Sequence, residues 1–153
     1  MIDDATGDPR LTGTRIGREA LCLLLPAGTA DTRFAALEEL GFIAHPDGWL
    51  YAEEVFALNY PDEFRGAEHL AMRAFVNQIG QIPAPVAQGI GYTLLPRSGF
   101  EAFAERDSLT VAQLAHQRHR DLWLLHRRGR ELPARVVRVA ALVTEVAARL
   151  AES

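Results

Sequence analysis

An uninterrupted apolar segment near the beginning of the chain is the feature that most constrains its fold. Residues 20–25 read ALCLLL, and the segment ends at the turn-forming residues Pro26, Ala27 and Gly28. A half-buried strand alternates apolar and polar side chains, so a continuous apolar run suits a strand that is buried on both faces. The segment therefore predicts an interior strand of a sheet.

The rest of the chain alternates between further strand-like and helix-like segments. Strands are expected at residues 42–44, 70–76, 90–95 and 122–126. Helices are expected at residues 34–40, 50–59 and 77–86, around residues 100–103, and from residue 133 onward. Because a proline inside a helix removes a hydrogen-bond donor, Pro83 and Pro85 predict that the third helix begins late or is distorted. Strands alternating with helices indicate an α/β fold with mostly parallel pairing.

Composition and charge limit the class of protein. Of the 153 residues, 48% are hydrophobic and 24% are charged, which is ordinary for a globular domain. The formal net charge of −4 gives the whole chain no attraction to nucleic acid or to an anionic membrane. The single cysteine, Cys22, rules out an internal disulfide and fits a reducing compartment. With no membrane-spanning stretch and no signal peptide, the sequence predicts a cytoplasmic protein.

The strong catalytic signatures are absent from the sequence, which has no HExxH motif, no GxSxG motif and no phosphate-binding loop. The nearest approach to a metal cluster is His116, His119 and His126, but no cysteine or carboxylate completes a set with ligand spacing. We therefore expect no enzymatic activity, no cofactor and no bound metal.

Two places where an expected strand leads into an expected helix are candidates for ligand binding. The first comprises His45, Pro46, Asp47 and Gly48, and the second comprises Val76, Asn77 and Gln78. Ligands of parallel α/β sheets gather at the carboxyl ends of strands, and helix N-termini offer free N–H groups to anions. Simple helix capping accounts for the same residues, and the two explanations are compatible.

Four segments, taken in order, carry a resemblance to a known family. They are residues 9–28, residues 40–48, residues 75–79 with 89–96, and residues 122–136. The third segment ends in GIGYTLLP, which fits the pattern GxGxxxLP, and the fourth is similar to a closing strand and last helix. Together the segments resemble the effector domain of LysR-type transcriptional regulators, over nearly the whole chain.

The resemblance implies a fold like that of type II periplasmic binding proteins, in which crossing strands join two α/β lobes. Residues 1–13 would be a flexible arm, residues 42–118 the complete second lobe, and residues 14–41 with 119–153 a partial first lobe. The effector-facing positions would be the loop of residues 45–48 together with residues 76–78. The N-terminal winged helix-turn-helix domain and the opening part of the first lobe would be missing.

The function implied by the resemblance is sensing of a small-molecule effector, an anionic metabolite, by part of a LysR-type regulator. Such a domain forms a homo-oligomer, a dimer, and DNA would be contacted only through the missing N-terminal domain; no membrane is involved. One alternative is a stand-alone solute-binding module, against which the lack of a signal peptide argues. Another is a dominant-negative interaction protein that pairs with intact regulators.

Overall fold

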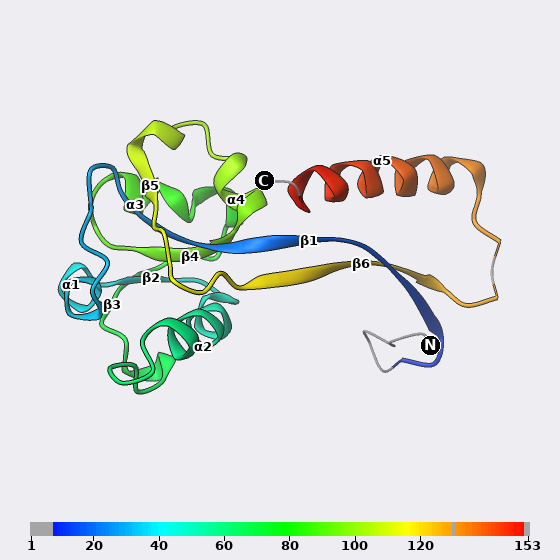
Figure 1. The fold of residues 1–153 in the computed structure, drawn as a ribbon. Coiled ribbons are helices and arrows are strands. Elements are labelled where there is room, and N and C mark those ends of the chain that lie inside the picture. Colours follow the sequence, from blue (N-terminus) through cyan, green and yellow to red (C-terminus); the bar gives the residue numbers. More distant parts are fainter. Residues whose placement is uncertain (1–7, 130, 152–153) are drawn as a thin grey trace. The chain divides into compact units, whose positions relative to one another are not determined.

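A computed structural model describes residues 8–129 and 131–151 of the chain, which divide into two compact units (Figure 1). The larger unit is Ala20–Arg118, and the smaller comprises the described residues of Met1–Glu19 and His119–Ser153. Residues 20–41 belong to the larger unit, and the assignment of the lobes stays a prediction. Of the expected flexible arm, residues 1–7 lie outside the described residues, and residues 11–13 belong to the first strand.

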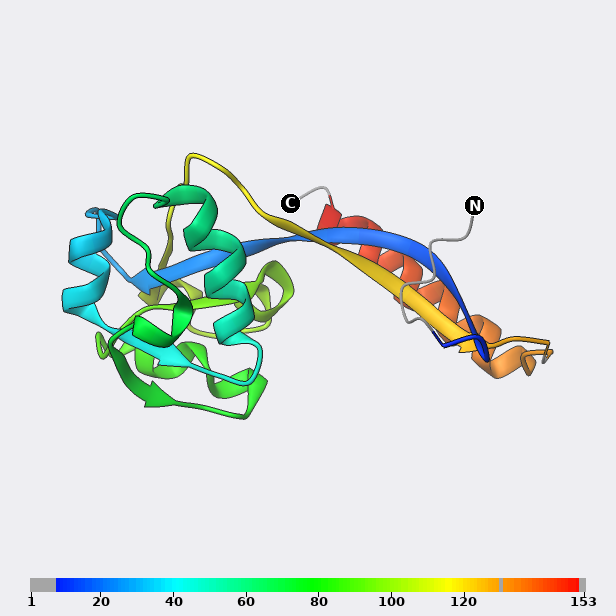
Figure 2. The ribbon, with the colours of Figure 1, turned by 90° about the horizontal axis from the view of Figure 1, so that it is seen from below.

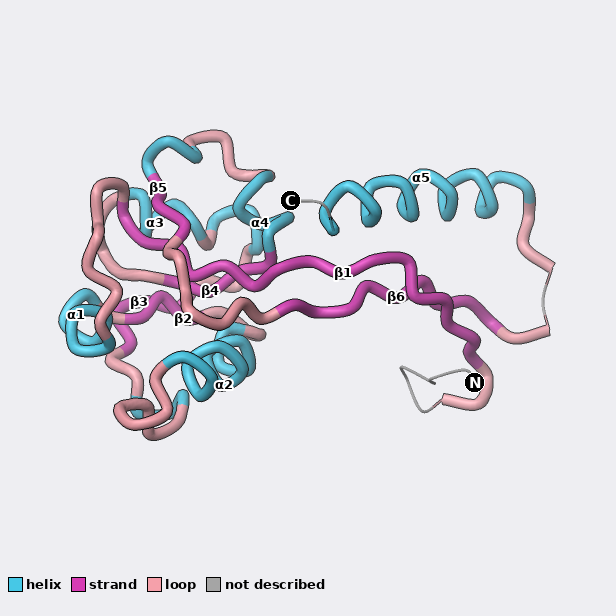
Figure 3. The backbone as a smooth tube through the Cα atoms, in the orientation of Figure 1, coloured by secondary structure: helices cyan, strands magenta, loops and turns pink. Residues whose placement is uncertain are grey.

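The main sheet of the larger unit is built around the first strand, β1 (Leu11–Pro26). Strand β4 (Thr93–Pro96) pairs with one edge of β1 and β5 (Leu109–Val111) with the other, both antiparallel (Figure 3). The predicted interior strand is thus confirmed. The prediction of mostly parallel pairing is wrong for β1, because its partners come from much later in the chain, where the local alternation of strands and helices does not set their direction.

Burial along β1 shows why a continuous apolar run was needed there. Leu21, Leu23 and Leu25 pack into one hydrophobic cluster, whereas Cys22 and Leu24 pack into a second cluster. Successive side chains of a strand point to opposite faces, so both faces of the sheet are covered at this strand. Other strands, helices and loops of the larger unit supply the rest of the two clusters.

A second, parallel pairing joins β2 (Phe42–Ala44) to β3 (Met72–Phe75), and helix α2 (Gly48–Asn59) connects them. A parallel bridge also pairs Phe42 with Tyr92, next to the beginning of β4. There the Ile43 amide donates to the Tyr92 carbonyl oxygen at 2.7 Å, and the Tyr92 amide donates to the Gly41 carbonyl oxygen at 2.8 Å. Because this bridge is parallel, β2 and β4 run in the same direction there, and their carboxyl ends lie on the same side.

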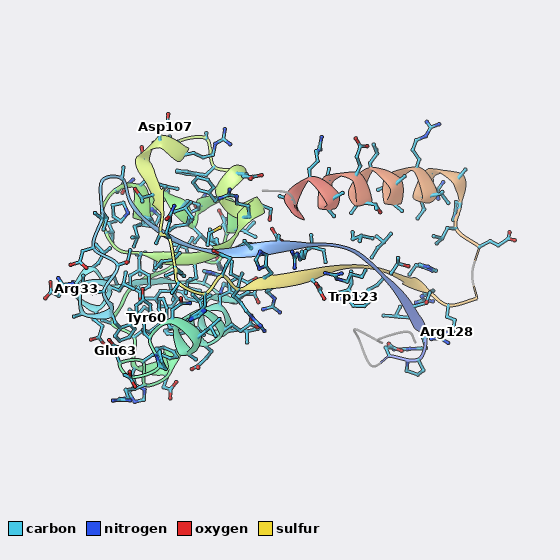
Figure 4. The ribbon with its side chains drawn as sticks, viewed as in Figure 1. Arg33, Tyr60, Glu63, Asp107, Trp123 and Arg128 are labelled. Atoms are coloured by element: carbon cyan, nitrogen blue, oxygen red, sulfur yellow. The ribbon has the colours of Figure 1, made fainter. Side chains whose placement is uncertain are left out.

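An aromatic group fills the first hydrophobic cluster. Phe56 of α2 is fully buried, and its ring makes edge-on contacts with Phe34 at 5.9 Å, Phe64 at 5.7 Å and Tyr92 at 5.8 Å between centroids. Phe34 begins helix α1 (Phe34–Leu40). Tyr60 also contacts Phe56, and its hydroxyl donates to the Thr32 carbonyl oxygen at 2.6 Å (Figure 4).

The remaining helices of the larger unit are short. The helix expected at residues 77–86 is a 3-10 turn, η2 (Ile79–Gln81), followed by α3 (Pro83–Ala87), which confirms the distortion predicted from the prolines. The others are α4 (Arg97–Glu101) and the 3-10 turns η1 (Ala67–His69) and η3 (Arg106–Ser108).

The smaller unit contains the beginning of β1, strand β6 (His119–Arg127) and helix α5 (Ala134–Ala151) (Figure 2). Strands β1 and β6 run in opposite directions. At one end the Arg128 amide donates to the Arg10 carbonyl oxygen, and at the other end the Leu21 amide donates to the Arg118 carbonyl oxygen. At Gly17 a side-chain carbon would lie 2.8 Å from the Ala147 carbonyl oxygen, so α5 packs closely on β1 there.

Helix α5 also leaves much apolar surface exposed. Between 39% and 58% of each of the following side chains is exposed: Val136, Val137, Val139, Leu142, Val143 and Val146. None of the described helices is long and apolar enough to cross a membrane.

Candidate functional site

His45 directly follows β2 and is held in one orientation by the end of β4. Its side chain is 3% exposed, and Nε2 lies 2.8 Å from the Leu94 carbonyl oxygen. Because a carbonyl oxygen can only accept, Nε2 carries a proton and donates it in this bond. The bond thus fixes the position of the ring, which lies at the carboxyl ends of β2 and β4. It also fixes which nitrogen carries the proton in the neutral ring.

A glycine next to His45 makes this arrangement possible. Gly48 begins α2 and is buried, and a side-chain carbon there would lie 3.0 Å from Cδ2 of His45 and 3.2 Å from Cζ of Phe42. The Gly48 amide donates to the His45 carbonyl oxygen at 2.9 Å. Asp47 is the N-cap residue of α2, but its side chain makes no capping hydrogen bond. Capping of α2 by its side chain therefore does not explain the presence of Asp47 at this position.

The second predicted segment follows β3. The Val76 amide donates to the Ala44 carbonyl oxygen at 2.9 Å, and the Val76 side chain packs against the second hydrophobic cluster. Asn77 and Gln78 are exposed. The Gln78 side chain makes no capping bond to the 3-10 turn that follows it.

A hollow of about 110 Å³ brings part of both segments together. We call it the His45 hollow, and it is lined by His45, Pro46, Asp47, Tyr51, Asn77, Ile79, Ile82, Leu95 and Pro96. Four of the seven predicted residues thus lie around it, whereas Gly48, Val76 and Gln78 are not among its lining residues. Their binding role stays a prediction.

Sequence reasoning missed five of the lining residues, and three of them carried a usable signal. Tyr51 lies one helical turn after Asp47 on α2, and its amide donates to the Asp47 carbonyl oxygen at 3.0 Å. Leu95 and Pro96 end β4 and close the GxGxxxLP pattern, at the same edge as His45. The general rule that ligands gather at carboxyl strand ends applies to β4 as well as to β2.

Charge in the His45 hollow is limited to one carboxylate. No lysine or arginine is among the lining residues, and Asp47 supplies the negative charge. Burial lowers the pKa of His45 below its usual value of 6.5. The hydrogen bond to Leu94 and the charge of Asp47 raise this pKa, but by less than burial lowers it. The imidazole is therefore neutral near pH 7, and this lining offers an anion no cationic side chain.

The lowered pKa of His45 predicts a loss of stability in acid. The unfolded chain takes up a proton at this residue as the pH falls below about 6.5, whereas the folded chain resists it, so the free energy of unfolding decreases from that pH downward. We expect a His45→Gln variant to lose this part of the acid sensitivity. Urea unfolding midpoints at about pH 7.5 and about pH 5.5 measure the difference.

A matched control for this prediction is His119→Gln, since His119 is exposed on β6. That variant should keep the acid sensitivity of the parent chain. If the two variants respond equally to pH, the acid sensitivity does not come from His45.

The histidines considered as metal ligands do not form a cluster. Among the described residues, no group of three or more histidine, cysteine, aspartate or glutamate side chains is placed to hold a metal ion. His116 is exposed, and its backbone exchanges two hydrogen bonds with the Asn59 side chain, at 2.9 and 3.0 Å.

Comparison with known proteins gives one family and a set of similar structures. The family model described as the LysR substrate binding domain matches residues 2–148. The effector domain of the regulator AmpR of Pseudomonas aeruginosa has a TM-score of 0.64 at 16% identity, covering 95% of this chain and 69% of that one. HinK, a LysR family regulator of the same organism, has a TM-score of 0.65 at 16% identity, covering 96% of this chain and 51% of that one.

A third similar structure contains a ligand. The effector-binding domain of QuiR in complex with shikimate has a TM-score of 0.61 at 8% identity, covering 93% of this chain and 68% of that one. At these identities the solved structures show a shared fold. No match was found among curated proteins. The chain spans about half the length of HinK.

Proposed function

The chain belongs to the LysR substrate-binding domain family, and from this premise we propose that it senses a small-molecule effector for a LysR-type transcriptional regulator. The observation that carries the proposal is the His45 hollow, where a buried, oriented imidazole lies with Asp47 and Asn77 at the carboxyl ends of two strands. A domain of the same fold, that of QuiR, has been solved with shikimate. The family does not favour a solute-binding module or a dominant-negative protein.

The proposal assigns DNA contact to another domain of the regulator. The net charge of −4 on this chain supports that division of labour, because phosphate contacts need a local excess of lysine and arginine. The proposal further includes a cytoplasmic location, association of effector domains with one another, and no catalysis. The exposed apolar side chains of α5 support association.

A pair of substitutions tests the proposed site. The parent chain is screened by calorimetric titration against small metabolites that include shikimate, and we expect at least one to bind saturably. Asn77→Ala should then weaken binding by about tenfold, because one hydrogen bond to the ligand is lost. Gln88→Ala is the control, since Gln88 is exposed, is not among the predicted site residues and lies outside the lining of the hollow.

Two results would contradict the proposal. In the first, no member of the screen binds saturably. In the second, Gln88→Ala weakens binding as much as Asn77→Ala does, which would place the ligand elsewhere on the molecule.

A further inference from the structure

The His45 hollow has a definite hydrogen-bonding polarity. Resting on the proposed function, we infer that the ligand group bound in this hollow is a hydrogen-bond donor, a hydroxyl or an ammonium group, and not a carboxylate or phosphate. The tautomer of His45, the orientation of its ring and the groups around it together set this polarity.

The tautomer is set by the bond to β4. Nε2 donates its proton to the Leu94 carbonyl oxygen at 2.8 Å, so a neutral imidazole has a lone pair and no proton on Nδ1. Adding a proton at Nδ1 would create a buried imidazolium, and burial already lowers the pKa of this group. Nδ1 therefore acts as an acceptor.

The ring orientation leaves this acceptor for a ligand. The edge formed by Nε2 and Cδ2 faces the Leu94 carbonyl oxygen and Gly48, so Nδ1 lies on the other side of the ring. The imidazole lines the hollow and is 97% buried, and among the described residues no hydrogen bond to Nδ1 is found. A donor group of a ligand in the hollow would supply a partner for this acceptor.

The carboxylate beside His45 has the same polarity. The ionised carboxylate of Asp47 accepts hydrogen bonds and does not donate them, and it makes no capping bond to α2. The Asn77 amide and the Tyr51 hydroxyl, which also line the hollow, can each accept or donate, so they do not oppose a donor. The positive end of the α2 dipole would attract an anion, but Asp47 already places a negative charge at that end. A second anion beside Asp47 would be repelled, whereas a hydroxyl is tolerated and an ammonium is attracted.

Three small probes that share a skeleton test the inference. Propane-1,2-diol, 1-aminopropan-2-ol and lactate are similar in size and are neutral, cationic and anionic near pH 7. Each is titrated into the chain while nuclear magnetic resonance follows the side-chain amide of Asn77 and the ring of His45. We expect the diol and the amino alcohol to bind at these residues at least about tenfold more tightly than lactate.

Substitution of Asp47 distinguishes a hydroxyl donor from an ammonium donor. Asp47→Asn should weaken binding of the amino alcohol and bring lactate closer to the diol, because the charge beside the ligand is removed. Asp62→Asn is the control, since Asp62 is exposed in the turn after α2 and is not among the residues that line the hollow.

The outcomes distinguish this inference from the proposed function. If lactate binds most tightly and shifts the Asn77 and His45 signals, the hollow binds ligands but the inference about donors is wrong. If no probe shifts these signals at any concentration, both the inference and the proposed site are wrong.

Discussion

Replacing Phe56 with alanine is expected to lower the free energy of unfolding by about 3–5 kcal/mol. The side chain is fully buried, and its ring contacts Phe34, Phe64 and Tyr92. These partners come from different parts of the larger unit, so they cannot all move inward to fill the space left by the ring. Urea unfolding, followed by the fluorescence of Trp49 on the same helix, measures the change.

A second alanine substitution on α2 provides the comparison for Phe56. Leu58 is 44% exposed, so Leu58→Ala removes a side chain of similar hydrophobicity from the same helix without opening a cavity. We expect this variant to lose less than about 1 kcal/mol. Equal losses in the two variants would mean that the aromatic cluster is not the main source of stability in this unit.

The second large effect is expected at Gly91, where the backbone leaves no room for a side chain. A side-chain carbon there would lie 2.5 Å from the Gly41 carbonyl oxygen and 2.9 Å from Cδ1 of Ile43. The Gly41 oxygen cannot easily retreat, because it accepts the Tyr92 amide at 2.8 Å. We therefore expect Gly91→Ala to lower the free energy of unfolding by about 2–3 kcal/mol, measured by the same urea titration.

Gly80→Ala is the matched control for this substitution. A side-chain carbon at Gly80 has no neighbour within 4 Å, and its backbone does not adopt a positive φ. The stability of that variant should stay within about 0.5 kcal/mol of the parent chain, or rise slightly because alanine restricts the unfolded state. A large loss at Gly80 together with no loss at Gly91 would contradict the close approach of Gly91 to Gly41.

The parts of the fold that sequence reasoning predicted well are those governed by local pattern. The buried run at residues 20–25, the distortion caused by Pro83 and the course of α2 each follow from neighbouring residues. Strand β5 and the extension of β1 back to Leu11 were not expected. Their pairing involves residues far apart in the chain, and local periodicity carries no information about such partners.

The candidate site shows a similar division. His45 and Asp47 were found because a strand end followed by a turn and a helix start is visible in the sequence. Val76 was chosen with Asn77, but its side chain packs into the second hydrophobic cluster. Choosing between such neighbours requires knowing which way each side chain points. Pro96 was missed because the sequence alone did not show that β4 ends beside β2.

The pairing of β1 has a consequence for how the chain is made. Its partners are β4, β5 and β6, so no sheet partner of β1 has been synthesised until residue 93 is reached. At a translation rate of about 5–20 residues per second, the apolar run of residues 20–25 remains without its sheet partners for several seconds. A nascent chain in that state is a natural client for a chaperone that binds extended apolar segments. Yield during expression should therefore depend on chaperone supply and on the rate of translation.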